Sequence, residues 1–226
     1  MELLRPTLAR ILAERGKVAT VGADQFIYFR EGDASRRIAP DVYVLPGVKP
    51  GTRIKSWKVW HEGFAPSFCF EVVSEDVRYD YEEKPILYGE MGTRELIVFD
   101  PESEGQPERY RWQVFRRVKG RGFVRVAISQ ADRVRSKELR LWLRHVGEGA
   151  NMRVLPALGD DGDDLVQTAE ERAQSERAEK EHERAERLQA QLEVERLKAE
   201  LLALKGAPSR TTVAKPRSPA NKKRRP

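Results

Sequence analysis

The sequence predicts an α/β fold, with a mixed β-sheet core flanked by helices and followed by a long C-terminal helix. Three observations support this fold class. Strand-like runs bounded by Gly and Pro recur between residues 18 and 167, one helix-like segment connects the two most apolar runs, and residues 169–205 contain no proline. A strand, a helix and a second strand within roughly 30 residues are typical of a crossover unit that joins two parallel strands.

The composition supports one sizeable core. The chain has 226 residues, of which 39% are hydrophobic, enough for a single core domain of roughly 150 residues. Its one cysteine and three scattered histidines lack the spacing of a zinc site, so neither zinc nor a disulfide is expected. No segment approaches the roughly 18 apolar residues of a membrane span. We therefore expect a soluble, cytoplasmic protein without a membrane partner.

The first predicted element is a short amphipathic helix. Leu8, Ile11 and Leu12 have helical spacing, Pro6 suits the first turn and Gly16 suits the end of the helix. This helix is expected to cover one face of the sheet.

Strands and one further helix follow. Residues 81–92 contain helix-forming residues and end at Gly92, a residue suited to the position after a helix. Lys58, Val59 and Trp60 form either a short strand or part of an inserted loop. KGRG, residues 119–122, predicts a hairpin loop between two strands. The sequence predicts strands within 18–21, 25–29, 36–47, 67–74, 95–101, 108–118, 122–129, 138–146 and 151–167. The sheet is expected to be mixed.

A charged helix is predicted over residues 169–205. Near its end an apolar seam has the three- and four-residue spacing of a coiled coil, but earlier positions in that register are charged. The helix is thus either a solvated helix stabilised by ion pairs between residues four apart, or an element for self-association. We expect the chain to form a homo-oligomer through the C-terminal part of this helix. The seam residues are Val194, Leu197, Leu201 and Leu204, and the earlier polar positions are Glu176, Lys180, Glu183 and Arg187.

The positive charge of the chain belongs to its last residues. Residues 206–226 hold seven of the 42 Lys and Arg residues and no acid, so the other 205 residues contain 35 bases against 36 acids. This proline-rich segment is expected to be a disordered basic tail. It either contacts nucleic-acid phosphates or serves as a solubilising end.

Glu71 does not fit its surroundings. It lies within SFCFEVVS, residues 67–74, where apolar residues occupy both faces of the predicted strand. Burying an unpaired carboxylate costs roughly several kcal/mol. Glu71 therefore either faces solvent at a sheet edge, or it is buried beside a cationic partner or a metal ion.

A second acid and a lysine suggest a metal site. Asp41 follows Pro40 at the head of the apolar strand DVYVL, and Pro40 fixes an extended entry into that strand. If the two strands are neighbours, Asp41 and Glu71 could converge on Mg²⁺, which polarises a phosphodiester and lowers the pKa of an attacking water. An ammonium from Lys84 would orient that water and stabilise the charge of the transition state. Each of these residues also has an ordinary structural interpretation as a turn or surface residue.

The motifs APDVYVL and PSFCFEVVSEDVRYDYEEKPILYGEMGTRELIVFDP resemble the PD-(D/E)XK nuclease superfamily, most closely its Uma family of putative restriction endonucleases. The resemblance is strongest over residues 39–101 and weaker through residues 138–155 and into the long helix. It implies a restriction-endonuclease-like core over residues 1–168, followed by a charged coiled-coil helix at 169–205 and a basic tail at 206–226.

The resemblance also implies roles for individual residues. Asp41 and Glu71 match the two acidic ligands of Mg²⁺, for which Mn²⁺ could substitute, and the backbone carbonyl of Val72 would assist them. Where the superfamily has its usual lysine, two residues after the glutamate, this chain has Val73. In the Uma family the following helix supplies the lysine, and Lys84 stands at that place. The third metal ligand is unassigned.

Asp80 and Tyr88 are expected to support the lysine. Both lie four residues from Lys84, so a continuous helix would place all three on one face. Pro85 cannot lie deep inside a helix, which places the expected helix start close to Glu82.

The resemblance implies cleavage of DNA phosphodiester bonds that leaves a 5′-phosphate. The alternative is a catalytically inactive protein that keeps the nuclease fold and acts as a DNA-binding or coiled-coil interaction module. Basic residues in the first third of the chain are candidates for contacts with the DNA backbone. They are Arg36, Arg37, Arg53, Lys55 and Lys58.

Overall fold

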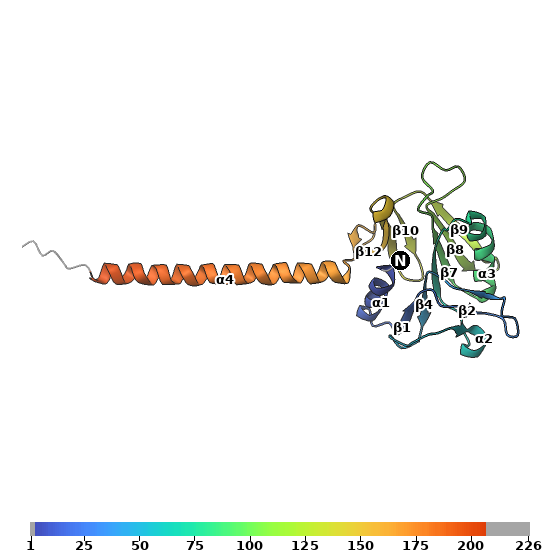
Figure 1. Cartoon of the computed structure of the whole chain (residues 1–226), viewed down its shortest axis with the longest axis horizontal. Coiled ribbons are helices and arrows are strands. Elements are labelled where there is room, and N and C mark those ends of the chain that lie inside the picture. The colour runs from blue at the N-terminus through green and yellow to red at the C-terminus, as the bar shows by residue number, and fades with distance from the viewer. Residues whose placement is uncertain (1–2, 207–226) are drawn as a thin grey trace, which may run out of the picture. The chain divides into compact units, whose positions relative to one another are not determined.

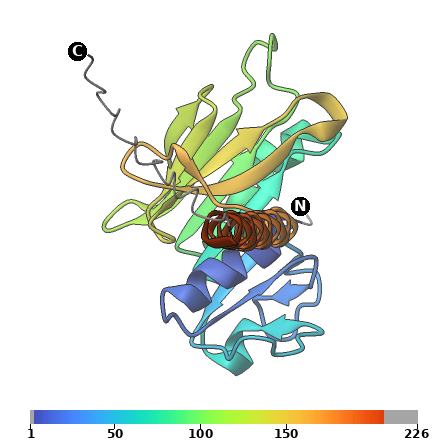
Figure 2. The same cartoon turned by 90° about the vertical axis from the view of Figure 1, so that its left-hand side faces the viewer.

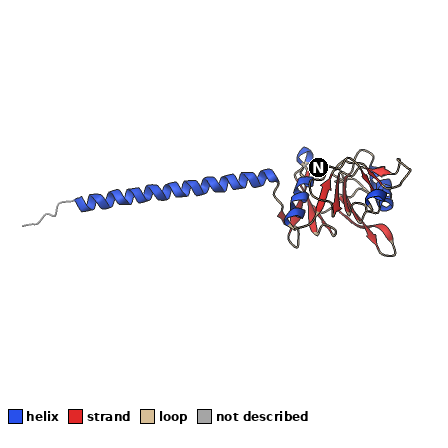
Figure 3. Ribbon diagram, turned by 90° about the horizontal axis from the view of Figure 1, so that it is seen from below, coloured by secondary structure: helices blue, strands red, loops and turns tan. Residues whose placement is uncertain are grey.

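The computed structural model describes residues 3–206. Strands form most of the regular structure of its first compact unit, which ends at Arg172, and a second unit begins at Ala173 (Figure 3). The expected basic tail lies outside the described residues, except for Gly206. The predicted α/β class is confirmed, with several sheets, flanking helices and a long C-terminal helix.

The main sheet has six strands in the order β1-β4-β6-β7-β8-β9. Strands β6 and β7 are parallel, and every other neighbouring pair in this sheet is antiparallel, so the predicted mixed sheet is confirmed. The hairpin predicted at KGRG connects β8 and β9. The strand bounds are β1 Ala19–Gly22, β4 Val42–Pro46, β6 Phe68–Val72, β7 Glu95–Phe99, β8 Trp112–Val118 and β9 Gly122–Ser129.

The crossover between β6 and β7 contains two kinds of helix. A π-helix, η1 Tyr79–Glu83, runs directly into the α-helix α3 Lys84–Met91, which ends at Gly92 with a left-handed φ of 101°. The expected start close to Glu82 is therefore wrong, because the chain is already helical at Tyr79. Pro85 lies at the start of α3, directly after the π-helix.

Apolar layers cover both faces of the main sheet. Helix α1, Leu4–Glu14, lies on one face, and α3 covers the other (Figure 1). Alternation along β6 divides its side chains between these layers, with Phe68 and Phe70 on the α1 side and Cys69 on the α3 side.

A second sheet packs on the α1 face. It has the order β10-β11-β12-β13, and in Figure 2 its yellow and orange strands lie in front of the green strands of the main sheet. The sequence prediction missed β10, a short strand with alternating arginines. The bounds are β10 Arg133–Ser136, β11 Leu141–Val146, β12 Arg153–Leu158 and β13 Asp164–Leu165, with a short 3-10 turn, η2 Gly149–Asn151, before β12.

A small third sheet packs on the α3 face. Its order is β3-β2-β5, with β2 Ile27–Tyr28, β3 Arg37–Ile38 and β5 Trp57–Lys58. The predicted strand region 36–47 thus forms two strands in different sheets. The ambiguous Lys58–Trp60 segment ends β5 and begins a helical turn, α2 Val59–Glu62.

The long helix α4 spans Ala169–Gly206. It begins with a reciprocal cap, in which Thr168 Oγ1 accepts a hydrogen bond from the Glu171 N–H and the Glu171 carboxylate accepts one from the Thr168 N–H. Val194, Leu197 and Leu201 are about half exposed, so the expected self-association remains a prediction. Among the helices of residues 3–206, none has the length and apolar character needed to cross a membrane.

Candidate active site

Two carboxylates face the same side of the main sheet. Strands β4 and β6 pair with Val42 opposite Phe70, and continuing this register by one residue places Asp41 opposite Glu71. Directly opposed residues in an antiparallel pair point to the same face, and here that is the α3 face. The sheet therefore brings together the two acids that the sequence singled out.

Asp41 is bound to the backbone of the neighbouring strand. Its Oδ2 accepts a hydrogen bond of 2.7 Å from the Val72 N–H. Burial raises the pKa of Asp41, and the Val72 N–H and the Lys84 charge only partly oppose this effect. Because the N–H and C=O of a strand residue point to the same side, the Val72 carbonyl is also directed toward the β4 side.

Glu71 is buried, with an exposed fraction of 1%. Its Oε2 lies 2.7 Å from the Lys84 ammonium, and its Oε1 accepts a short hydrogen bond from the Tyr88 hydroxyl. Burial raises the pKa of Glu71 to about 7, although the Lys84 charge favours the ionised form. The charge inside this strand thus has a cationic partner, which is one of the two interpretations left open by the sequence.

Lys84 also pairs with Asp80, whose Oδ1 lies 2.8 Å from Nζ. Burial acts to lower the pKa of Lys84, but the carboxylates of Glu71 and Asp80 outweigh it and raise that pKa above its usual range. Lys84 therefore remains a cation near neutral pH and can supply positive charge and hydrogen bonds, but not a base.

Asp80 is fixed by a residue that the sequence analysis did not single out. Ser74, just after β6, donates to Asp80 Oδ2 from its backbone N–H at 2.6 Å and from its hydroxyl at 2.8 Å. Burial acts to raise the pKa of Asp80, but the hydrogen bonds from Lys84 and Ser74 outweigh it and lower that pKa. The available signal in the sequence was the serine that ends the predicted strand SFCFEVVS.

Asp80, Lys84 and Tyr88 converge as the sequence predicted, although not on a continuous α-helix. Asp80 belongs to the π-helix, Lys84 begins α3, and Tyr88 lies one turn further along. The superfamily's usual lysine position, Val73, belongs to the apolar cluster beneath α3, and the ammonium reaches Glu71 from the helix instead.

A second buried cluster holds the π-helix against the end of β7, and the sequence analysis did not find it. The Tyr81 hydroxyl donates to Asp100 Oδ2 at 2.6 Å. Arg109 donates to both oxygens of the same carboxylate, at 2.8 and 2.7 Å. Asp100 is fully buried, so this bidentate pair compensates its charge. The available signal in the sequence was the Asp100-Pro101 pair at the end of the strand predicted within residues 95–101.

The donor set of the site fits a magnesium ion that keeps most of its waters. Two carboxylates and one carbonyl are suitable oxygen ligands, and Mg²⁺ in proteins commonly has only one or two carboxylate ligands. Within residues 3–206 no group of three or more His, Cys, Asp or Glu side chains could hold a metal. Glu14 lies on α1, which covers the other face of the sheet, so it is not part of this donor set. It forms ion pairs with Arg10 and Arg172. The negative charge of Asp24, in the turn after β1, contributes to raising the pKa of Asp41.

The predicted DNA-contacting residues do not all gather in one place. Arg37 and Lys58 lie opposite Tyr28 on the two strands that flank it, so the two cations lie in one row across the three-stranded sheet. Arg37 also stacks over the Phe26 ring, with its guanidinium carbon 4.7 Å from the ring centroid. Arg36 pairs with Glu90 at 3.5 Å. Arg53 and Lys55 lie in the exposed loop before β5.

The chain is similar to a known protein family and to solved structures. The model of the Uma2 family, described as "Putative restriction endonuclease", matches residues 2–144. Among solved structures, one similar chain is described as a "putative nuclease belonging to DUF820" from Anabaena variabilis ATCC 29413. It is 13% identical with a TM-score of 0.40, and the match covers 59% of this chain and 68% of that one. No curated protein matches the sequence.

Proposed function

The chain belongs to the Uma2 family, and from this premise we propose that it is a metal-dependent endonuclease that hydrolyses phosphodiester bonds of DNA. One observation carries the proposal. The Lys84 ammonium lies 2.7 Å from Glu71, which is opposite Asp41 in the sheet register. Two acids and a lysine on one face are the groups needed for phosphodiester hydrolysis assisted by a metal ion.

Asp41, Glu71 and the Val72 carbonyl would hold Mg²⁺, or Mn²⁺ in its place. When bound, the ion supplies Lewis acidity that polarises the phosphodiester and lowers the pKa of a coordinated water. Of the two carboxylates, Glu71 must give up its proton for this role, because burial raises its pKa to about 7.

Lys84 has two tasks in the proposed reaction. Its ammonium orients the attacking water and stabilises the additional negative charge that develops on the phosphoryl oxygens. Asp80 positions Lys84 through the 2.8 Å ion pair, and Tyr88 positions Glu71 through its hydroxyl. The attack of water on phosphorus, with the 3′-oxygen as leaving group, gives a 5′-phosphate product.

DNA is the proposed partner, and the row of Arg37 and Lys58 is a candidate for backbone contacts. These two cations share Tyr28 as their strand neighbour. They would contact phosphates without reading the base sequence.

The test is cleavage of supercoiled plasmid in Mg²⁺ or Mn²⁺. The wild-type chain should nick or linearise the plasmid, whereas Asp41→Asn, Glu71→Gln and Lys84→Met should each lose at least about a hundredfold in rate, as expected for loss of transition-state stabilisation. Glu83→Gln is the matched control, because Glu83 is exposed and directly precedes Lys84.

Two results would contradict the proposal. Nicking that survives all three substitutions would place the activity elsewhere or in a contaminant. Retained DNA binding without cleavage under either metal would favour the alternative function, a nuclease-fold protein that acts as a DNA-binding module.

A further inference from the structure

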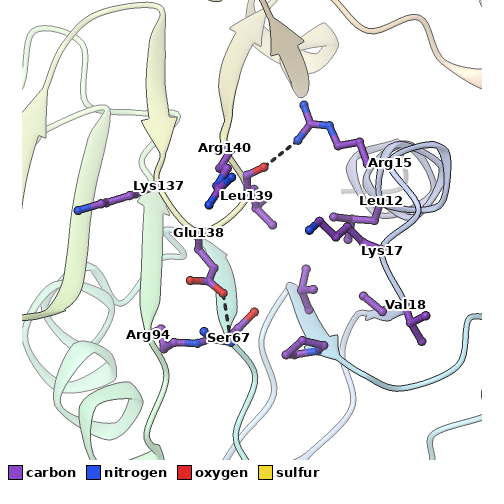
Figure 4. Close-up of a pocket in the computed structure, with 13 residues that line it drawn as sticks. Leu12, Arg15, Lys17, Val18, Ser67, Arg94, Lys137, Glu138, Leu139 and Arg140 are labelled. Carbon is purple, nitrogen blue, oxygen red and sulfur yellow. Dashed lines mark hydrogen bonds and ion pairs between the residues drawn. The ribbon is translucent and has the colours of Figure 1, made fainter.

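A basic groove lies at the end of the main sheet away from the paired acids. It has a volume of about 550 Å³, and its walls come from the end of α1, the end of β4 and the turn between β10 and β11 (Figure 4). It includes Pro46, Ser67 and Arg94, whereas Asp41 and Glu71 lie at the other ends of β4 and β6. Four residues of strand, about 13 Å, separate Ser67 from Glu71.

Two neighbouring grooves extend this surface, one beside residues 116–119 and the other beside residues 135–137. All three grooves share Lys137. Together they contain nine basic and two acidic residues, whereas residues 1–205 as a whole are close to neutral. We call this surface the basic strip. Its bases are Arg15, Lys17, Arg94, Arg116, Arg117, Lys119, Arg135, Lys137 and Arg140.

Both acids of the basic strip are already neutralised. Glu138 pairs with Arg94 at 3.3 Å, and Glu95 pairs with Arg116 at 2.6 Å. The other seven bases form no ion pair with any residue in the described range 3–206. Their charges are therefore available to an external anion.

Buried hydrogen bonds hold the turn between β10 and β11, which carries Lys137 and Arg140. The carboxylate of Glu95, which is 2% exposed, accepts hydrogen bonds from the backbone N–H groups of Lys137 and Glu138 and from the Ser136 hydroxyl. Arg15 donates to the Leu139 carbonyl at 2.9 Å, which ties the turn to α1. Binding at this surface would thus order few additional groups, which favours affinity.

The extent of the basic strip fits a linear polyanion. It crosses β4, β6, β7 and β8, three strand spacings or about 14 Å. The phosphates of a nucleic-acid duplex are regularly spaced along each strand, so a strip of this length can meet more than one of them. Guanidinium groups match phosphate oxygens in geometry as well as in charge.

We propose that the basic strip binds the phosphate backbone of duplex DNA at a second surface, separate from the paired acids. The choice of DNA rests on the proposed nuclease function, whereas the preference for a polyanion rests on the charges alone. Binding here holds the chain on DNA without engaging the bond to be cut.

The experiment measures binding without cleavage. Anisotropy of a fluorescent 30-base-pair duplex is titrated with the full chain in EDTA over a series of NaCl concentrations. The groove variant is Lys17→Ala, Lys137→Ala and Arg140→Asn, because these three side chains are exposed and Arg140 has a left-handed φ of 54°, which Asn tolerates. The control carries the same charge change on exposed residues of α4, Arg177→Ala, Lys180→Ala and Arg184→Ala.

The groove variant should bind at least about tenfold more weakly at moderate salt. The slope of its plot of log affinity against log salt concentration should be smaller in magnitude by about 2 to 3. The control should bind within about twofold of wild type. Equal losses in the two variants, or an unchanged groove variant, would overturn the proposal. It would also fail if a polyglutamate peptide bound the groove as tightly as DNA, since the partner would then be an acidic protein. Because no cleavage is measured, the result can be read whether or not the chain is a nuclease.

Discussion

The ammonium of Lys84 lies 2.7 Å from Oε2 of Glu71, thirteen residues earlier in the chain. This contact connects the first strand of the crossover with the helix that follows it. It also compensates the charge of a side chain that the sheet buries almost completely.

Replacing Lys84 with Met should lower the free energy of unfolding by about 3–5 kcal/mol near pH 8. The substitution leaves the buried carboxylates of Glu71 and Asp80 without a cation, and an uncompensated buried charge is strongly destabilising. Urea denaturation provides the measurement. Lys58→Met, at an exposed lysine, should change stability by less than about 0.5 kcal/mol. If the two variants were equally stable, the Lys84 contacts would be unimportant for the fold.

Stability should depend on pH through Glu71. Its pKa in the folded chain is raised to about 7, so the folded state binds a proton more tightly than the unfolded state does. The stability of the metal-free wild type should therefore decrease as pH rises from about 4.5 to 7, by up to about 3 kcal/mol from this residue. Glu71→Gln cannot titrate and should show a flatter profile in urea denaturation over that range. Parallel profiles would contradict the raised pKa.

Asp100→Ala should destabilise the domain by about 3–5 kcal/mol, because it leaves Arg109 and the Tyr81 hydroxyl without their buried partner. Hydrogen exchange should also show faster exchange in the π-helix, which Tyr81 anchors. The control is Glu102→Ala, at a side chain that contacts the same arginine at 3.7 Å but is 81% exposed. Its effect should stay within about 0.5 kcal/mol. Similar losses in both variants would argue against the anchoring role.

Self-association should depend on the apolar seam of α4. Leu197→Lys combined with Leu201→Lys should lower the mass measured by light scattering, because charges would replace apolar contacts between helices. Leu202→Lys is the control, since Leu202 is 70% exposed and lies beside the seam. A wild-type chain that is monomeric over the micromolar range would remove the association hypothesis.

The sequence predicted the crossover unit and its functional candidates because their signals are local. Glu71 in an apolar strand, Asp41 after a proline, and Lys84 flanked by Asp80 and Tyr88 are visible without any knowledge of strand order. The opposition of Asp41 and Glu71 depends on the register between β4 and β6, which the sequence did not specify. The site residues nevertheless remain predictions until cleavage is measured.

Features that depend on tertiary contacts were missed. The π-helix at Tyr79–Glu83 has no composition that distinguishes it from an α-helix, and Asp100, which accepts a hydrogen bond from Tyr81, lies after the next strand of the chain. The basic strip likewise collects its bases from four separated segments. No window of the sequence contains enough of them to reveal a surface.

The π-helix makes the position of Lys84 depend on the number of residues before it as well as on their identity. A π turn closes its hydrogen bonds one residue later than an α turn. Removing Glu82 would leave Asp80 three residues before the lysine instead of four and would change the direction in which the two side chains leave the helix. Such a deletion would change the geometry of the Asp80–Lys84 ion pair even though both side chains were retained.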